Sequence, residues 1–290
     1  MLENIELAAS NMPWLFSAFF FVFGACVGSF LNVCIYRIPE GKSIISPPSH
    51  CKCGAKIKWH DNIPILSWFI LKGRARCCHE PFSFRYPFVE TLCAVVFACI
   101  WNFFPMAQAF AYMFFFALMV VVSFIDIDCM ELPDLLTVGG CVAGVVVSFL
   151  VPQIHVKDAM EGAPFLFYAI KSALISVIGI AVSTGFLYWF RLLAEYVFKR
   201  EAMGEGDVVL IGCIGAFCGW QGAIFAIFGG SLIGSLIMIP IIIWFRIFVR
   251  RKKIMETIPY GPWLAIGAAV YLFVQKYVDF YFEGIKAIFF

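Results

Sequence analysis

Residues 165–192 (FLFYAIKSALISVIGIAVSTGFLYWFRL) decide the class of fold. Between Lys171 and Arg191 this stretch holds 19 consecutive residues without a charged side chain. A helix of about 20 apolar residues is long enough to cross the hydrocarbon core of a membrane, which is roughly 30 Å thick. The stretch therefore predicts a transmembrane helix, since a helix that is apolar on every side needs an apolar environment all around it.

The composition of the whole chain agrees with this prediction. The 290 residues are 62% hydrophobic and 14% charged, and the mean hydropathy is +0.91. A soluble domain averages roughly 45–50% apolar and about 25% charged residues. These values exclude an ordinary soluble enzyme, a disordered chain and a secreted disulfide scaffold. The net charge of +2 does not indicate a nucleic-acid partner, so a polytopic membrane protein with the lipid bilayer as its surroundings remains.

Further apolar runs extend the prediction to about eight transmembrane helices in an all-α polytopic membrane protein. We expect them at residues 14–35, 86–104, 106–125, 135–151, 165–192, 208–225, 227–245 and 263–282. The one long polar stretch predicts a loop domain after the first helix. The chain then divides into an N-terminal helix, a cysteine-containing loop domain and a seven-helix membrane domain, at residues 1–36, 37–85 and 86–290.

The charges predict which side of the membrane each loop faces. Residues 37–85 contain nine Lys and Arg against three acidic residues, a net charge of +6. With the turns after the fifth and seventh helices, they hold 17 of the 21 basic residues. Alternating spans place all three regions on one side, which the positive-inside rule assigns to the cytoplasm.

Two carboxylates at this cytoplasmic border are candidates for chemistry. Asp126 ends the third predicted helix and Asp207 begins the sixth. Ionisable groups near the membrane core are costly and are functional candidates by default. Two close carboxylates share a proton, so that one serves as general base toward water and the other as general acid. The alternative that the residues leave open is ordinary helix capping, in which an aspartate at a helix N-terminus, such as Asp207, complements the helix dipole.

Several motifs resemble one family. Gly204-Glu205-Gly206-Asp207 is the GxGD signature of membrane aspartyl proteases, in which Gly204 and Gly206 permit a tight backbone beside the aspartate. The other segments, in chain order, are GSFLNVCIYRIP (28–39), DNIPILSW (61–68), RYPFVE (85–90), DIDCMELPD (126–134) and IPYGPWL (258–264). Together, over residues 24–270, they resemble type IV prepilin peptidases.

The resemblance implies an integral-membrane aspartic endopeptidase of the bacterial inner membrane, with its active site facing the cytoplasm. Such enzymes cut the basic leader from type IV prepilins and type II secretion pseudopilins. They then N-methylate the new terminal residue, usually Phe, with S-adenosylmethionine. The catalytic pair of the family falls on Asp126 and Asp207. The first loop is implied in S-adenosylmethionine binding, but no GxGxxG fingerprint marks a site, so its residues stay unknown.

The chain departs from the family pattern in two places. Many members carry two CxxC pairs in the first loop, a spacing typical of structural zinc. Here the four thiols stand as Cys51, Cys53, Cys77 and Cys78, and they are candidate zinc ligands. A loop folded by its apolar residues alone is the alternative. The family also often has Lys two residues after the GxGD aspartate, where this chain has Val209.

The GxGD motif and the two aspartates leave two other functions open. A presenilin-like or signal-peptide-peptidase-like intramembrane protease would keep the GxGD motif, but its Tyr-Asp pair and Pro-Ala-Leu element do not match this chain. An ion-coupled transporter would use Asp126 and Asp207 as a relay. Transporters often show internal repeats and broken helices at the membrane midplane, and the sequence has no evident repeat.

Overall fold

The computed structural model is built from helices, and the predicted all-α class is confirmed. It describes residues 11–48, 50–51, 53–156, 164–200, 203–245, 247 and 259–289, with side chains described up to residue 280. In this part of the chain there is no strand, only two isolated β-bridges. The long helices are α2 (Pro13–Arg37), α4 (Arg85–Phe103), α5 (Met106–Cys129), α6 (Asp134–Leu150), α7 (Phe165–Phe198), α8 (Glu205–Trp244) and α9 (Gly261–Phe289). The short ones are η1 (Trp59–Asn62), α3 (Leu66–Ile70) and η2 (Pro152–Ile154).

Among the described residues, five helices are long and apolar enough to cross a membrane: α2, α4, α5, α7 and α8. The 17-residue α6 is apolar but shorter. The chain is therefore an all-α polytopic membrane protein, and the count of eight spans stays a prediction. The basic turn expected after the seventh helix lies mostly outside the described residues.

The prediction of a boundary between helices at residues 225 and 227 is wrong. The structure runs helically through both positions, and the break lies at Gly219, with φ 69° and ψ 175°. Such positive φ values are accessible to glycine without the steric penalty that a Cβ brings. Hydropathy cannot locate the break, because the sequence is apolar on both sides of it.

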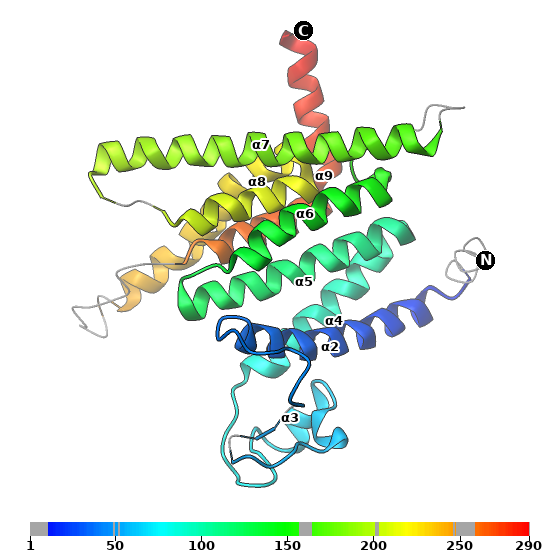
Figure 1. Ribbon diagram of the computed structural model, residues 1–290, viewed down its shortest axis with the longest axis vertical. Helices are drawn as coiled ribbons and strands as arrows, with labels where there is room; N and C mark the ends of the chain where they lie inside the picture. Colours follow the sequence, from blue (N-terminus) through cyan, green and yellow to red (C-terminus); the bar gives the residue numbers. More distant parts are fainter. Residues whose placement is uncertain are drawn as a thin grey trace. The chain divides into compact units, whose positions relative to one another are not determined.

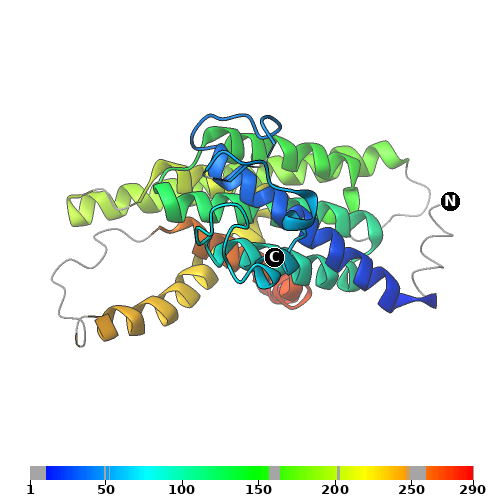
Figure 2. The same cartoon turned by 90° about the horizontal axis from the view of Figure 1, so that it is seen from below.

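The chain turns back on itself at Gly219. The Tyr260 hydroxyl lies 2.8 Å from the Ser231 hydroxyl and donates to the carbonyl of Ile227 at 3.2 Å. Tyr260 also lies within electrostatic range of Asp207. In a straight helix, residues 207 and 227 would be about 30 Å apart at 1.5 Å per residue. Both halves of α8 therefore approach Tyr260, and Figures 1 and 2 show them running in different directions.

The contacts divide the chain into two units, Met1–Val121 and Val122–Phe290, so α5 begins in the first and ends in the second. The domain boundaries expected at residues 36/37 and 85/86 stay a prediction. In the first unit α2 packs against α4 (Figure 1) through glycine. A Cβ at Gly24 would lie 2.5 Å from the Cys93 carbonyl oxygen. Small residues at such contacts let membrane helices approach closely.

In the second unit, polar side chains satisfy the backbone where α8 breaks. The carbonyl oxygen of Ala216, three residues before Gly219, accepts hydrogen bonds from Ser176 at 2.9 Å and from Ser148 at 3.4 Å. His155 Nε2 donates to the same oxygen at 3.0 Å. A broken helix is tolerated inside an apolar bundle only where neighbouring groups satisfy its freed backbone. These contacts hold the first half of α8, which begins with the GxGD motif.

Candidate active site

Asp126 is buried at the end of α5, with 5% of its surface exposed. Its Oδ2 accepts a hydrogen bond of 2.9 Å from the backbone N–H of Gly261, the first residue of α9. A Cβ on residue 261 would lie 2.7 Å from the same oxygen. Glycine at this position therefore lets the backbone reach the carboxylate.

Asp207 is buried in the first turn of α8, with 9% of its surface exposed. Its carboxylate accepts a hydrogen bond from the backbone N–H of Gly204, the residue that caps the helix. An acidic side chain at the third helical position commonly reaches back to the capping residue in this way. The capping role considered for Asp207 is thus present in the structure.

The structure brings Asp126 and Asp207 together from helices far apart in the sequence. The charge of Asp126 acts on the Asp207 carboxylate, and Tyr260 lies within electrostatic range of Asp207. The turn between α5 and α6 also meets the GxGD motif, because a Cβ on Gly206 would lie 2.9 Å from the Cβ of Leu132. The three motifs that contain Asp126, Asp207 and Gly261 therefore surround one point in the second unit.

The other acidic residues of this region lie at the surface. Asp128 and Glu131 are exposed, and so is Asp134, which is the first residue of α6. Asp134 directly follows Pro133, which is the N-cap residue of α6. A carboxylate in the first turn still complements the positive end of the helix dipole.

Arg191 is a neighbour of the GxGD motif that sequence reasoning missed. Its Nε donates to Glu195 at 2.7 Å, and its Nη2 lies 3.5 Å from Oε1 of the exposed Glu205. The chain lacks the Lys that the family often has at position 209, but α7 supplies this cation beside the motif. Nothing in the spacing could reveal the contact, since Arg191 belongs to another helix.

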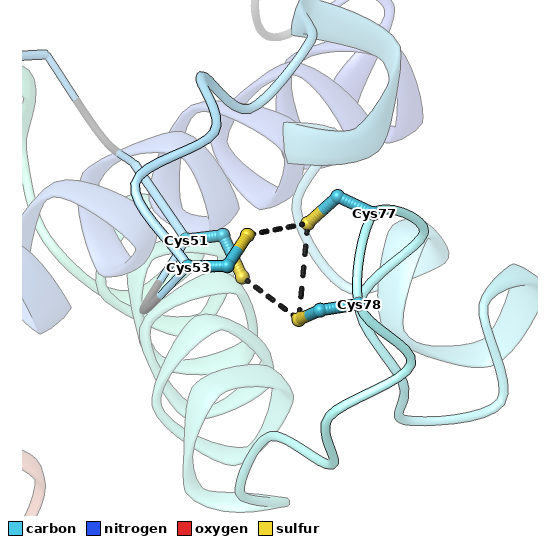
Figure 3. A group of neighbouring side chains, drawn as sticks. All are labelled: Cys51, Cys53, Cys77 and Cys78. Carbon is cyan, nitrogen blue, oxygen red and sulfur yellow. Dashed lines mark hydrogen bonds between the residues drawn. The ribbon is translucent and has the colours of Figure 1, made fainter.

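The four cysteines of the first loop form one cluster (Figure 3). Sγ of Cys51 lies 3.4 Å from that of Cys78, and Sγ of Cys53 lies 3.4 Å from that of Cys77. The sulfurs of Cys77 and Cys78 are 3.9 Å apart, and all four lie within 4.8 Å of one another. Sulfurs of a tetrahedral zinc site are about 3.8 Å apart, given Zn–S bonds of about 2.3 Å. The unusual CxC and CC spacings therefore still converge on a geometry suited to zinc.

The protonation of these thiols is unequal. Hydrogen bonds from the backbone of Cys53 and from the neighbouring thiols lower the pKa of Cys51 to about 7. Hydrogen bonds to the thiols of Cys53 and Cys51 raise the pKa of Cys77 to about 12. A metal ligand must be deprotonated, so a cation bound here would displace the proton of Cys77.

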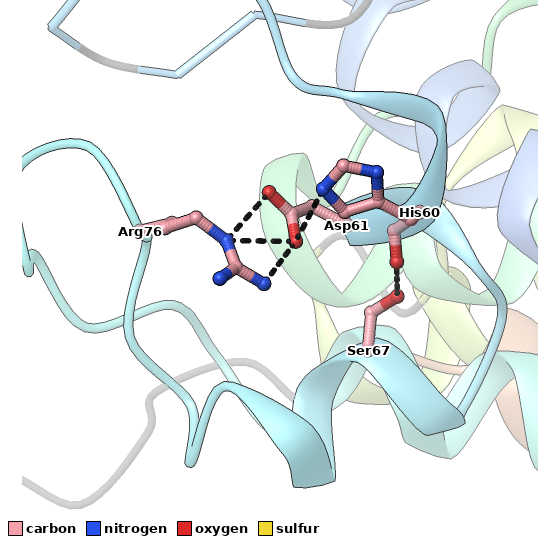
Figure 4. Close-up of polar contacts among 4 residues, drawn as sticks. All are labelled: His60, Asp61, Ser67 and Arg76. Carbon is pink, nitrogen blue, oxygen red and sulfur yellow. Dashed lines mark hydrogen bonds and ion pairs between the residues drawn. The ribbon is translucent and has the colours of Figure 1, made fainter.

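An ion pair joins the two halves of this loop (Figure 4). Arg76, next to the cysteines, donates from Nη2 and Nε to Asp61 at 2.8 and 3.0 Å. This hydrogen bonding lowers the pKa of Asp61. The hydroxyl of Ser67 in α3 donates to the His60 carbonyl, which brings η1 and α3 together. The cysteine cluster therefore sits on a folded loop.

Comparison with known proteins decides the family. Residues 113–239 match the model of the type IV leader peptidase family, and residues 22–104 match the bacterial peptidase A24 N-terminal domain. The chain belongs to the type IV leader peptidase family. It is therefore a membrane peptidase, and this favours the peptidase function over the ion-coupled transporter. The family match also spans both Asp126 and Asp207, whereas Gly261 lies beyond it.

Several relatives of this chain carry one and the same name. A protein named "Prepilin leader peptidase/N-methyltransferase" from Aeromonas hydrophila is 32% identical to this chain, over 92% of this chain and 93% of its own length. A protein of the same name from Klebsiella pneumoniae is 34% identical, over 76% of this chain and 94% of its own length. One of the same name from Myxococcus xanthus is 38% identical over 78% of this chain and 64% of its own length. No solved structure matches the chain.

Proposed function

We propose that this leader peptidase removes the basic leader of type IV prepilins and type II secretion pseudopilins with Asp126 and Asp207, and then N-methylates the new terminal residue. The observation that carries the proposal is the pair of buried carboxylates in the second unit, 5% and 9% exposed, which interact across helices distant in sequence. The names of the relatives support both activities.

The two carboxylates divide the work of hydrolysis. Because like charges close together do not both ionise readily, the pair holds one proton between them. The ionised member takes a proton from water, which attacks the scissile carbonyl, and the protonated member donates to the carbonyl oxygen. The Gly261 N–H fixes the orientation of Asp126 through the 2.9 Å hydrogen bond. Gly204 leaves the backbone near Asp207 without a side chain, so a substrate peptide can approach it there, whereas the space beside Gly206 is filled by the side chain of Leu132.

The leader binds beside the pair, on the exposed acidic residues. Glu205 has a side chain that is 87% exposed, and Glu131 is exposed as well. These carboxylates attract the basic leader while the apolar segment of the substrate stays in the bilayer. The active site then faces the cytoplasmic side of the bacterial inner membrane, as the distribution of Lys and Arg predicts.

Methyl transfer is the second activity, and S-adenosylmethionine is its donor. When bound, this cofactor supplies a methyl group carried on a sulfonium cation. S-adenosylmethionine has a net positive charge, from its sulfonium and ammonium groups against one carboxylate, and the described pocket of the first loop, lined by Lys72, Arg74 and Arg76, does not suit that charge. We therefore assign no residue of the chain to the cofactor and route no step of the reaction through it.

The cysteine cluster would hold a zinc ion with a structural role. The four sulfurs lie within 4.8 Å of one another and can occupy every corner of a tetrahedron. A site with four protein ligands leaves no open position for water, so the zinc would stabilise the loop and take no part in hydrolysis. Cys51 and Cys53 come from one side of the loop, and Cys77 and Cys78 from the other.

The proposed function is tested with purified protein in detergent, a prepilin and labelled S-adenosylmethionine. Cleavage with transfer of label to the new N-terminus is expected, whereas an inactive preparation that is folded would contradict the proposal. A Glu205→Gln variant is expected to raise the KM for prepilin several-fold with kcat retained, because it removes one leader contact. An unchanged KM would count against the role of Glu205.

A further inference from the structure

The helix α3 is fixed to the start of the membrane helix α4. The backbone N–H of Ile65, the residue before α3, donates to Oε2 of the buried Glu90 at 2.6 Å. Ile65 has a φ of 65°, and the N–H of Leu66 reaches the Pro64 carbonyl at 2.6 Å, which closes a strained three-residue γ-turn. Glu90 lies five residues into α4, about 8 Å along the helix from its first residue. The beginning of α3 is therefore held close to the membrane entry of α4.

The outer side of α3 is apolar. Leu66, Phe69 and Ile70 are 58%, 58% and 68% exposed, and we call these three residues the α3 face. Ser67 points inward, with 8% exposed, and its hydroxyl is bonded to the His60 carbonyl. Large apolar side chains next to each other on a surface mark an interaction site more often than scattered ones do.

A basic pocket adjoins the α3 face. It has a volume of about 550 Å³, with Ile70 and Leu71 on its apolar side and Lys72, Arg74, Arg76 and His79 on its basic side. Arg76 is already paired with Asp61. Lys72 and Arg74 make no ion pair with any residue in the described part of the chain, so their charges are available to a ligand. Ile70 belongs to both surfaces, which makes the pocket and the α3 face continuous.

We infer that the basic pocket and the α3 face together bind an anionic phospholipid of the surrounding membrane. The headgroup phosphate occupies the pocket against Lys72 and Arg74, and the acyl chains lie along Leu66, Phe69 and Ile70. Cationic side chains next to apolar ones are the composition of segments that lie in the membrane interface. Each Lys or Arg near an anionic membrane surface adds attraction to it. The anchoring of Ile65 to Glu90 places this surface at the matching depth.

The positive charge of the basic pocket favours an anionic phospholipid over the other candidate ligands of this protein. A prepilin leader is basic, so Lys72 and Arg74 repel it. S-adenosylmethionine has a net positive charge, from its sulfonium and ammonium groups against one carboxylate, and the same residues disfavour that charge. A second copy of the chain would bring two loops of net charge +6 together. An anionic lipid complements both the charge of the pocket and the apolar character of the α3 face.

The test measures lipid binding to the full-length protein in a neutral detergent by native mass spectrometry. Phosphatidylglycerol, phosphatidylcholine and inorganic phosphate are titrated separately against wild type, Lys72→Gln/Arg74→Gln and Lys56→Gln/Lys58→Gln. The second pair removes the same charge from exposed positions of the same loop that do not line the pocket. A Phe69→Ser/Ile70→Ser variant removes the acyl-chain contacts. Cleavage of prepilin by each variant verifies that the protein is folded.

Wild type is expected to retain phosphatidylglycerol in preference to phosphatidylcholine. Loss of Lys72 and Arg74 should weaken this binding roughly tenfold or more, and loss of Lys56 and Lys58 less than threefold. The serine variant should also weaken it. Equal effects of the two charge pairs, equal retention of phosphatidylcholine, or inorganic phosphate binding as tightly as the lipid would each overturn the inference.

Discussion

The backbone N–H of Gly261 donates a 2.9 Å hydrogen bond to Oδ2 of Asp126, across 135 residues of sequence. The bond joins the start of α9 to the end of α5, so α9 sets the orientation of one proposed catalytic carboxylate. No side chain on residue 261 fits beside this oxygen, since a Cβ would approach it to 2.7 Å.

A Gly261→Ala substitution should therefore disable cleavage while the protein stays folded. The added methyl group displaces the Asp126 carboxylate, and a shift of about 1 Å at a catalytic group can cost on the order of 100-fold in rate. Rates of prepilin cleavage by the purified variant check this. Gly185→Ala is the matched control, because nothing lies within 4 Å of a Cβ at that position. Equal rates for the two variants would show that the contact with Asp126 is unimportant.

The contact between Gly206 and Leu132 should behave as a coupled pair. Gly206→Ala brings a Cβ to 2.9 Å from the Leu132 Cβ and should lower both cleavage and the melting temperature. Removing the opposing side chain with Leu132→Gly should restore part of the loss in the double variant. A double-mutant cycle of the four proteins measures this coupling. Effects that simply add would mean that the two residues do not meet.

The turn at Gly219 should depend on glycine. Its φ of 69° and ψ of 175° lie in a region that is essentially restricted to glycine, where another residue costs on the order of 1–3 kcal/mol. Gly219→Ala should lower the melting temperature in detergent. Gly139→Ala, a position with open space in α6, should leave it unchanged or raise it slightly. An unaltered melting temperature for Gly219→Ala would argue against the turn.

Hydropathy and motif spacing predicted much of this protein for identifiable reasons. Uncharged stretches near 20 residues predict the helices directly, and Asp126 and Asp207 are noticeable because ionisable groups near the membrane core are costly. Hydropathy did not predict the turn at Gly219, because apolar residues flank it on both sides. The contact between Gly261 and Asp126 was not predicted, because its donor is a backbone N–H and the side-chain pattern of the sequence does not indicate such donors.

The loop was harder to predict because its geometry depends on local backbone turns. The spacings of Cys51 with Cys53 and of Cys77 with Cys78 look unsuited to one metal. Bridges between His50 and Lys56 and between Arg74 and Pro81 fold each half so that the sulfurs converge. Residue spacing alone contains no information about such turns.

Zinc binding should weaken as the pH falls. Zinc binds thiolates, and the raised pKa of Cys77, about 12, means that binding must release its proton. Protons therefore compete more strongly at lower pH, and chelators should remove the metal faster at pH 6 than at pH 8. Metal analysis should find one zinc per chain, lost in Cys78→Ser and kept in Cys26→Ser, which changes an exposed cysteine of α2. Metal-free wild type, or equal loss in both variants, would contradict a zinc site.

The most direct test of the central claim is prepilin cleavage by Asp126→Asn and Asp207→Asn, with Asp128→Asn as the control from the same end of α5. Each change keeps the shape of the side chain and removes one carboxylate. If Asp126 and Asp207 form the catalytic pair, both variants lose cleavage by several orders of magnitude at unchanged melting temperature, and Asp128→Asn cleaves at close to the rate of wild type. Cleavage at near wild-type rate by either Asp126→Asn or Asp207→Asn would contradict the account.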